Sequence, residues 1–230
     1  MPVADIIPSS TAGMTRAESA YRAIRDAILS NHLCVGEHLH EESIAQQLGI
    51  SRTPIREALG RLHSERLVKE AKPRGYVVSA VTATDIFHVY AVREELEGFC
   101  LRLAAGRITP HQIFQLSTII ARMDQELGDP QHFSQLNRRF HTTIFGVTDN
   151  PVLMKIMDDL MAVVDRFPVS AYEVDGRMSE VLVEHRQILD ALSRHDADAA
   201  EKAARTHLHI GLEARLIALR RHEMLGRTTE

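Results

Sequence analysis

The chain has 230 residues, enough for two domains of ordinary size, and 44% of them are hydrophobic, enough to build real cores. Its net charge of −4 gives the chain as a whole no attraction to nucleic acid. No apolar run approaches the roughly 20 residues of a membrane span, and the first 14 residues lack the features of a signal peptide. Two cysteines in separate parts of the chain predict no disulfide framework. We therefore expect a cytoplasmic protein with no membrane segment and a flexible tail over residues 1–14.

Two helices are predicted after this tail. Thr15 and Glu18 have the spacing of a capping box, and the helix that they open runs to about Asn31. A second, short helix covers about residues 42–48, and Gly49 supplies the left-handed residue that ends it. Another helix start follows this glycine after only two residues.

The run from Ser51 to Leu59 has the features of a helix that enters the major groove of DNA. Thr53 is expected to cap this helix and Pro54 to take its first position, where a missing N–H costs nothing. Arg52 and Arg56 are four residues apart and project from its leading end. An arginine that forks onto O6 and N7 of guanine contributes about 1–3 kcal/mol of base discrimination. The alternative for this run alone is a surface helix with solvated arginines, but the short helix before it predicts a helix-turn-helix.

A short hairpin is predicted directly after this helix. Residues 67–70 and 76–79 read as strands, and the loop between them carries Lys72, Arg74 and Gly75. A basic, glycine-tipped hairpin beside a recognition helix is a wing, whose cations can lie along phosphates or reach the minor groove. The first 80 residues carry ten basic against nine acidic side chains, whereas the remainder carries seventeen against twenty-two. Basic character is thus local, as expected for a small DNA reader joined to a larger partner domain.

Helix signals replace strand signals after Ser79 and predict an all-helical bundle of about six helices. The expected helix starts, three of them a capping residue followed by proline, are Thr82, Thr109-Pro110, Asp129-Pro130, Asn150-Pro151, Gly176 and Asp196.

Three histidines interrupt the apolar stripes of the later helices in this bundle. His141 lies one turn after Asn137, and His185 and His207 fall on the stripes of the last two helices. A buried imidazole needs a hydrogen bond or a metal. Any one of these histidines alone is better explained as a hydrogen-bonded core residue. The three together, with an amide oxygen, favour a shared divalent cation such as zinc or nickel, at about 2.0–2.2 Å from each ligand.

The first helix of the bundle carries an arginine where an apolar residue is expected. Arg93 lies on a stripe that otherwise contains Ile86, Val89, Leu96 and Cys100. A buried guanidinium stays charged and needs an anion. The anion is either an internal carboxylate, from Glu94 or Glu97, or a small carboxylate effector that lies between Arg93 and the metal.

The first part of the chain resembles the DNA-binding domain of GntR-family bacterial regulators over about residues 15–80. The matching segments are LGISRTPIREALGRLHSERLV and PRGYVV. The resemblance implies that Arg52 and Arg56 read bases and that Ser51 and Thr53 hold phosphates. It also implies that Gly75, next to Arg74 in the wing, lets the wing approach the groove floor. Some members of the family have an arginine in the second helix, where this chain has Glu42.

The rest of the chain, about residues 81–225, resembles the FCD ligand-binding domain of the FadR branch of that family. The matching segments are VYAVREELEGFCLRLAA, LNRRFHTTI, VEHRQILDAL and ARTHL. The metal ligands of the family correspond here to Asn137, His141, His185 and His207, and its effector-binding arginine corresponds to Arg93. Asn137 replaces an aspartate and is a neutral, weaker ligand. The implied metal is zinc, with nickel or manganese as alternatives.

These features predict a mostly α protein with a tail (1–14), a winged helix-turn-helix (15–80) and a helical effector-binding and dimerisation domain (81–230). We expect a homodimer that reads a palindromic operator in double-stranded DNA and responds to a small organic acid. One alternative is a regulator that senses the metal itself. Another is a metal-dependent hydrolase, which is disfavoured because no carboxylate sits in a metal-linked motif such as HExxH.

Overall fold

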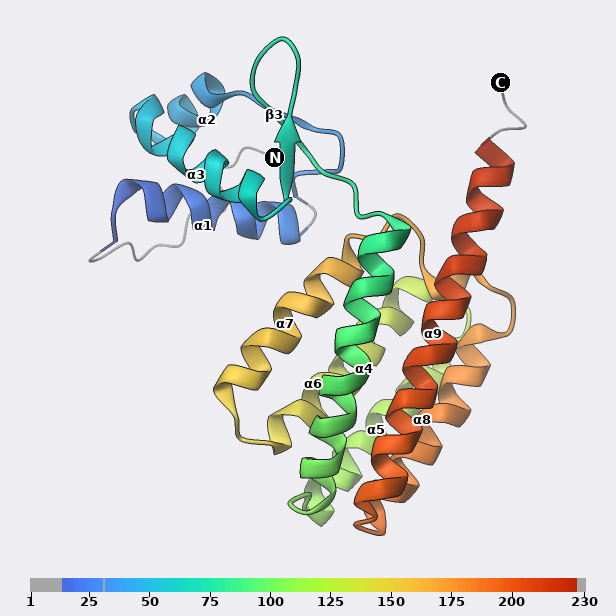
Figure 1. Ribbon diagram of the computed structural model, residues 1–230. Helices are drawn as coiled ribbons and strands as arrows, with labels where there is room; N and C mark the ends of the chain where they lie inside the picture. The colour runs from blue at the N-terminus through green and yellow to red at the C-terminus, as the bar shows by residue number, and fades with distance from the viewer. Residues whose placement is uncertain (1–13, 31, 227–230) are drawn as a thin grey trace. The chain divides into compact units, whose positions relative to one another are not determined.

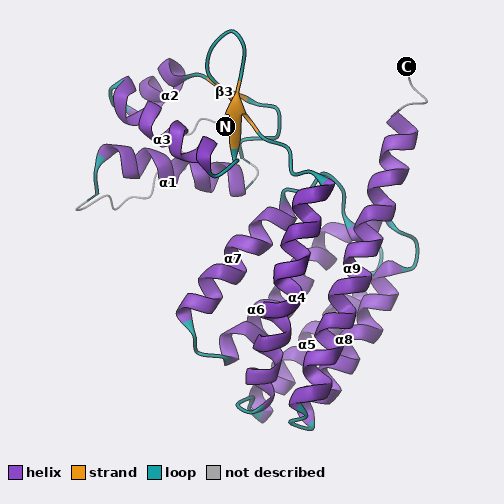
Figure 2. Cartoon of the chain, in the orientation of Figure 1, coloured by secondary structure: helices purple, strands orange, loops and turns teal. Residues whose placement is uncertain are grey.

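A computed structural model describes residues 14–30 and 32–226 of the chain, which divides into two compact units, Met1–Val81 and Thr82–Glu230. Helices dominate both units, and the strands of the described residues all belong to the first (Figure 2). The expected fold class is confirmed: a winged helix-turn-helix is followed by a helical bundle. Of the predicted tail, residues 1–13 lie outside the described residues.

In its described residues, the first unit combines three helices with a small antiparallel sheet (Figure 1). Its elements are α1 (Arg16–Leu29), β1 (His38–Leu39), α2 (Glu41–Leu48), α3 (Arg52–Ser64), β2 (Val68–Glu70) and β3 (Tyr76–Val78). β3 is the central strand and pairs antiparallel with both of its neighbours. The wing is therefore a three-stranded sheet and not an isolated hairpin.

Strand β1 is the element of this unit that the sequence does not predict. Two residues are too few to show the alternation by which a strand is recognised. In the sheet, His38 lies opposite Val77 and Leu39 opposite Tyr76. The buried side chain of Leu39 attaches the wing to the core of the unit.

The ends of α1 and α2 follow local capping rules in most respects. Thr15 caps α1 by accepting from the N–H of Glu18. The Glu18 side chain does not complete a capping box, because it pairs with Arg22 and Arg61 instead. Helix α1 ends at Leu29, two residues earlier than expected. Gly49 has the predicted left-handed conformation after α2, with a φ of 64°.

Helix α3 starts two residues earlier than predicted. Ser51 has extended backbone angles and is the N-cap residue, so Thr53 and Pro54 are the second and third helical residues. The prediction that Thr53 caps the helix and that Pro54 is its first residue is therefore wrong. The proline is tolerated because the first N–H groups of a helix have no intrahelical acceptor. The Ser51 side chain makes no capping hydrogen bond and is exposed.

The core of the first unit forms where α1 packs against α3. Ile24 and Ile28 of α1 and Ile55, Leu59 and Leu62 of α3 are completely buried. Each such side chain contributes about 1.5–3 kcal/mol through burial. The opposite face of α3 is left exposed and carries its arginines.

The second unit is a bundle of six α-helices and one short 3-10 helix within residues 82–226 (Figure 1). They are α4 (Ala83–Ala105), α5 (Pro110–Gln125), α6 (Pro130–Val147), α7 (Pro151–Asp165), η2 (Ala171–Glu173), α8 (Arg177–Ser193) and α9 (Ala197–Gly226). The predicted caps Thr82, Thr109, Asp129 and Asn150 each accept a hydrogen bond from a backbone N–H of the first turn.

The predicted apolar stripes of this unit are buried in α6 but only in part along α9. On α6, Phe133, Phe140 and Ile144 are completely buried. On α9, a helical stripe that continues from His207 through Ala214 includes Ile217, but Ile217 is 43% exposed. Ala214 and Ala218 are buried, so they and not Ile217 face the bundle at that level.

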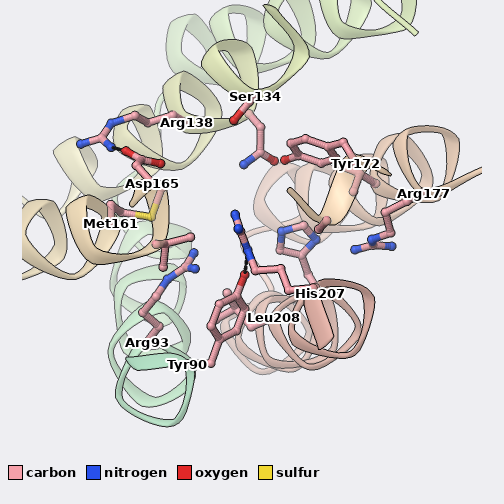
Figure 3. Close-up of a pocket in the computed structure, with 16 residues that line it drawn as sticks. Tyr90, Arg93, Ser134, Arg138, Met161, Asp165, Tyr172, Arg177, His207 and Leu208 are labelled. Carbon is pink, nitrogen blue, oxygen red and sulfur yellow. Dashed lines mark hydrogen bonds and ion pairs between the residues drawn. The ribbon is translucent and has the colours of Figure 1, made fainter. Parts of the chain in front are cut away.

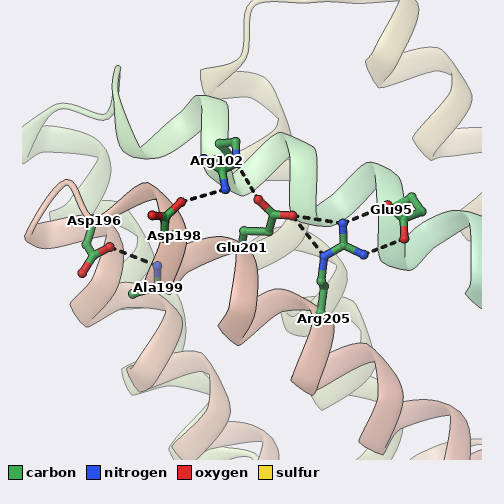
Figure 4. Close-up of polar contacts among 7 residues, drawn as sticks. All are labelled: Glu95, Arg102, Asp196, Asp198, Ala199, Glu201 and Arg205. Carbon is green, nitrogen blue, oxygen red and sulfur yellow. Dashed lines mark hydrogen bonds and ion pairs between the residues drawn. The ribbon is translucent and has the colours of Figure 1, made fainter.

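Helices α4 and α9 run side by side and are joined at the surface by ion pairs (Figure 4). Arg205 contacts Glu95 at 2.7 Å and Glu201 at 3.0 Å, and Arg102 contacts Glu201 at 2.5 Å. Gly98 allows the close approach, because a Cβ there would lie 3.1 Å from Nε of Arg205. Exposed pairs of this kind contribute little stability each. In the part of the chain that the structure describes, no helix is long and apolar enough to cross a membrane.

Candidate functional site

The arginines at the start of α3 share one carboxylate, that of Glu41 at the start of α2. Arg56 donates from Nε to Oε1 at 3.1 Å and from Nη2 to Oε2 at 3.0 Å, which is a bidentate pair. Arg52 reaches Oε2 of the same residue at 3.5 Å. The hydrogen bonds from Arg56 hold the pKa of the Glu41 carboxyl below its usual value. Glu41 therefore stays ionised and holds both guanidinium groups in one arrangement.

A single groove of the first unit brings these arginines together with the wing. Its lining includes Arg52, Arg56, Arg74 and Gly75, together with Glu41. Ser51 and Thr53 are exposed at the start of α3 and do not line the groove. The arrangement provides three guanidinium groups on one concave face, which suits the phosphates and base edges of a DNA duplex.

Gly75 has a structural role that the sequence does not reveal. Its φ is 99°, in the region that side chains rarely adopt, and a Cβ would lie 3.0 Å from the backbone oxygen of Leu39. The wing loop can therefore pack against β1 only with glycine at this position. The expectation that Gly75 serves approach to a DNA groove remains a prediction.

A cluster of three buried imidazoles lies inside the second unit. His141 of α6, His185 of α8 and His207 of α9 each offer a ring nitrogen, and these three nitrogens lie within 4.8 Å of one another. The ring centroids are 5.0–5.4 Å apart. Three helices that are distant in sequence thus bring their predicted ligand residues to one point.

The imidazole of His207 is oriented by a buried carboxylate. Its Nδ1 lies 2.6 Å from Oε2 of Glu184, which in turn accepts from Arg177 at 2.5 and 2.8 Å. Burial alone would raise the pKa of the Glu184 carboxyl, but the bonds from His207 and Arg177 lower it. An ionised Glu184 fixes a proton on Nδ1 and leaves Nε2 of His207 as a lone-pair donor.

The other two imidazoles have nitrogen atoms without hydrogen-bond partners. Both ring nitrogens of His185 and Nε2 of His141 are buried and have no partner among the described residues. Burial holds the pKa of His185 well below its usual value, so its ring is neutral. His185 is held in place by stacking on Phe140, with ring centroids 4.0 Å apart. Unpaired buried nitrogens are costly unless something coordinates them.

Arg93 lies next to this cluster and is paired with Glu97. Its Nε and Nη2 lie 2.8 and 2.7 Å from Oε1 of Glu97, which resolves the choice between Glu94 and Glu97. The second carboxylate oxygen of Glu97 lies 3.1 Å from Nδ1 of His141. Burial alone would raise the pKa of Glu97, but Arg93 and His141 hold it at about 2. The group that links Arg93 to the imidazoles is thus the carboxylate of Glu97.

A small cavity of about 50 Å³ opens between these groups (Figure 3). Arg93, Asn137 and His207 line it, so the cavity reaches both the predicted effector-binding residue and two predicted ligands. Asn137 is half-buried, and its Oδ1 has no hydrogen-bond partner among the described residues. His141 and His185 do not line this cavity.

Comparison with known proteins identifies both units. Residues 16–78 match the family described as bacterial regulatory proteins, gntR family, and residues 88–209 match the FCD domain. The chain therefore belongs to the GntR family, in the branch that carries an FCD domain.

Relatives of known description agree with this assignment. The chain is 27% identical to the HTH-type transcriptional repressor RspR of Escherichia coli (strain K12), over 83% of this chain and 85% of the relative. It is 23% identical to the uncharacterized HTH-type transcriptional regulator YdhC of Bacillus subtilis (strain 168), over 82% of this chain and 86% of the relative. The E. coli McbR/YncC structure has the same fold, with a TM-score of 0.65 and 21% identity over 88% of this chain and 98% of that one.

The protein is accordingly a DNA-binding transcriptional regulator and not an enzyme. The hydrolase alternative is excluded by the family and its relatives, which are regulators. The sequence did not indicate the roles of Glu41 and Glu184. It also did not indicate that Glu97, a candidate partner of Arg93, links Arg93 to His141. Each is recognisable only from its tertiary partner.

Replacing Glu41 by glutamine is expected to lower sequence specificity. Arg52 and Arg56 lose their shared anchor, and one negative charge leaves the groove. A unit charge about 4 Å from a phosphate is worth about 1 kcal/mol in water, so non-specific affinity should rise about five-fold. Fluorescence anisotropy with operator and unrelated duplexes, at one salt concentration, gives the ratio of specific to non-specific affinity.

The matched control is Glu42→Gln, which removes the same charge from the same groove without touching either arginine. This variant should raise both affinities and keep their ratio. Equal ratios for Glu41→Gln and Glu42→Gln would show that Glu41 does not position the arginines.

Proposed function

We propose that the protein is a ligand-responsive regulator whose helical domain, residues 81–230, binds a small carboxylate effector beside a divalent metal ion. The observation that carries this proposal is that both ring nitrogens of His185 and Nε2 of His141 are buried without a partner, in a cluster where each of the three histidines has a ring nitrogen within 4.8 Å of the others. Burying three polar rings at one point is unfavourable in free energy, and coordination of a shared cation offsets this penalty.

The donor set suits zinc, with nickel or manganese as alternatives. Three neutral imidazoles would hold the ion, and the unpaired Oδ1 of Asn137 would supply an oxygen ligand. Glu184 would support the site from outside through its bond to His207. When bound, the ion supplies a positive centre to which a carboxylate can attach.

Arg93 is the proposed contact for the effector carboxylate. Glu97 occupies Nε and Nη2 of its guanidinium, and Nη1 has no carboxylate partner among the described residues. A second carboxylate can therefore bind to Arg93 without displacing Glu97. The ligand shifts operator binding only through its different affinity for two arrangements of the domains.

The proposed DNA contacts are Arg52 and Arg56 with bases, Ser51 and Thr53 with phosphates, and Arg74 with Gly75 through the wing. One small reader has too little specificity for a genome, so we propose a homodimer on a palindromic operator. These residues are exposed, apart from the half-buried Gly75, and their exposure supports their assignment as DNA contacts.

Elemental analysis of protein purified without chelator tests the metal site. We expect about one divalent ion per chain in the wild type and little in His185→Gln, because that variant removes a ligand. His209→Gln is the control, since His209 is 67% exposed in its side chain and lies outside the cluster. Wild-type protein without metal, or equal loss in both variants, would contradict the site.

Replacing Glu184 by glutamine should weaken metal binding by about ten- to a hundred-fold, because His207 loses the carboxylate that orients it. Competition with a chromogenic chelator measures this affinity. Glu180→Gln is the matched control: Glu180 also contacts Arg177, at 3.2 Å, but is exposed and does not touch His207. Unchanged affinity in folded Glu184→Gln would argue against a supporting role.

Removing the charge of Arg93 should abolish the response to acid while DNA binding persists. Because Arg93→Gln leaves Glu97 buried without its guanidinium partner, Arg93→Gln/Glu97→Gln is tested beside it. A thermal-shift screen of small organic acids, followed by operator titrations, measures both functions. An unchanged acid-induced shift in both variants would contradict the role of Arg93. Operator affinity that follows metal concentration alone would identify the ion as the signal.

A further inference from the structure

Arg215 of α9 lines the same cavity as Arg93 and has no carboxylate partner among the described residues. Its Nε donates to the hydroxyl of Tyr90 at 3.0 Å, and its Nη1 donates to the backbone oxygen of Val169 at 2.9 Å. Tyr90 also lies under the guanidinium of Arg93, at 4.8 Å. One buried tyrosine thus holds two arginines at the cavity wall.

The other arginines that line the cavity are already neutralised. Arg93 pairs with Glu97, Arg177 with Glu184, and Arg138 with Asp165. Arg215 therefore adds a positive charge that nothing in the described structure offsets. A guanidinium in a half-buried position gains most from an anion that it can bind with two N–H groups.

The proposed ligands of the metal increase this excess of positive charge. Asn137 is neutral, and the three imidazoles are neutral when they coordinate a cation, so the full charge of a divalent ion would remain. The side chains of the cavity themselves make the potential at Tyr90 positive: burial alone would raise the pKa of Tyr90, but Arg215 and Arg93 bring it below its usual value.

We propose that this cavity selects short dicarboxylates over monocarboxylates, with one carboxylate at Arg93 and the other held by Arg215. The inference rests on the proposed function and narrows the proposed effector from small carboxylates to short dicarboxylates. A volume of about 50 Å³ holds only a few water-sized groups, so the acid must be short. The two guanidinium groups that contact Tyr90 then determine the number of charges that the ligand carries.

Isothermal titration of zinc-loaded, full-length protein tests this with two matched pairs: malonate against propionate, and succinate against butyrate. The wild type should bind at least one dicarboxylate ten-fold or more tightly than its partner. Arg215→Gln should weaken dicarboxylate binding about ten- to a hundred-fold and change monocarboxylate binding by less than about two-fold. Zinc content is measured after each titration, so that removal of the metal is not counted as binding.

Two further variants separate charge from structure. Arg220→Gln makes the same substitution at an exposed position of α9 and should leave all four affinities unchanged. Asn137→Asp adds a negative charge at the cavity and should reduce the preference for dicarboxylates. Thermal melting of each variant verifies the fold.

Equal binding of dicarboxylates and monocarboxylates by the wild type would overturn this inference and leave the proposed effector site intact. Equal losses for both acids in Arg215→Gln would overturn it as well, because they would indicate a structural role. Binding of none of the four acids by zinc-loaded protein would overturn both the inference and the proposed effector function.

Discussion

A charged group that is fully buried in the helical unit requires a partner of opposite charge, because burial removes the water that would solvate it. Arg93 with Glu97 and Arg177 with Glu184 meet this requirement as complete pairs. Each carboxylate also faces one of the histidines: Glu97 lies near His141, and Glu184 bonds to His207. The two carboxylates therefore do more than neutralise their arginines, because their contacts also fix the positions of the imidazoles.

Pairing of arginine with a carboxylate has a different effect in the DNA-binding unit, where the pair is exposed to solvent. Glu41 holds Arg52 and Arg56, but all three remain partly or fully exposed and can exchange partners. An exposed pair contributes little stability, so its effect lies in geometry: the guanidinium groups are already ordered before DNA arrives. Inside the bundle the pairs are permanent, whereas at the reading face they are replaceable.

Local rules were sufficient for most of the elements and failed where a distant partner decides the outcome. Thr82, Thr109, Asp129 and Asn150 cap helices because the bond that each makes lies within three residues. By contrast, the two-residue β1 exists only through its pairing with β3. The start of α3 moved to Arg52 because Ser51, and not Thr53, has the extended backbone of a cap.

For the candidate site, too, the sequence predicts which residues face inward but not which residues they contact. An apolar stripe interrupted at His141, His185 and His207 indicates inward polar groups, and the structure brings these three together. The partners could not be predicted in this way, because Glu184 and Arg215 act through contacts 23 and 125 residues away along the chain. Periodicity specifies which face a side chain takes, but not which side chain it meets there.

The central claim is that three imidazoles from α6, α8 and α9 share one metal ion. X-ray absorption at the zinc edge of the loaded protein measures this directly, because imidazole rings produce a characteristic outer-shell scattering. The account predicts a first shell of nitrogen and oxygen donors at about 2.0–2.2 Å, with three imidazoles. A first shell with no imidazole or only one, or one containing sulfur, would contradict it.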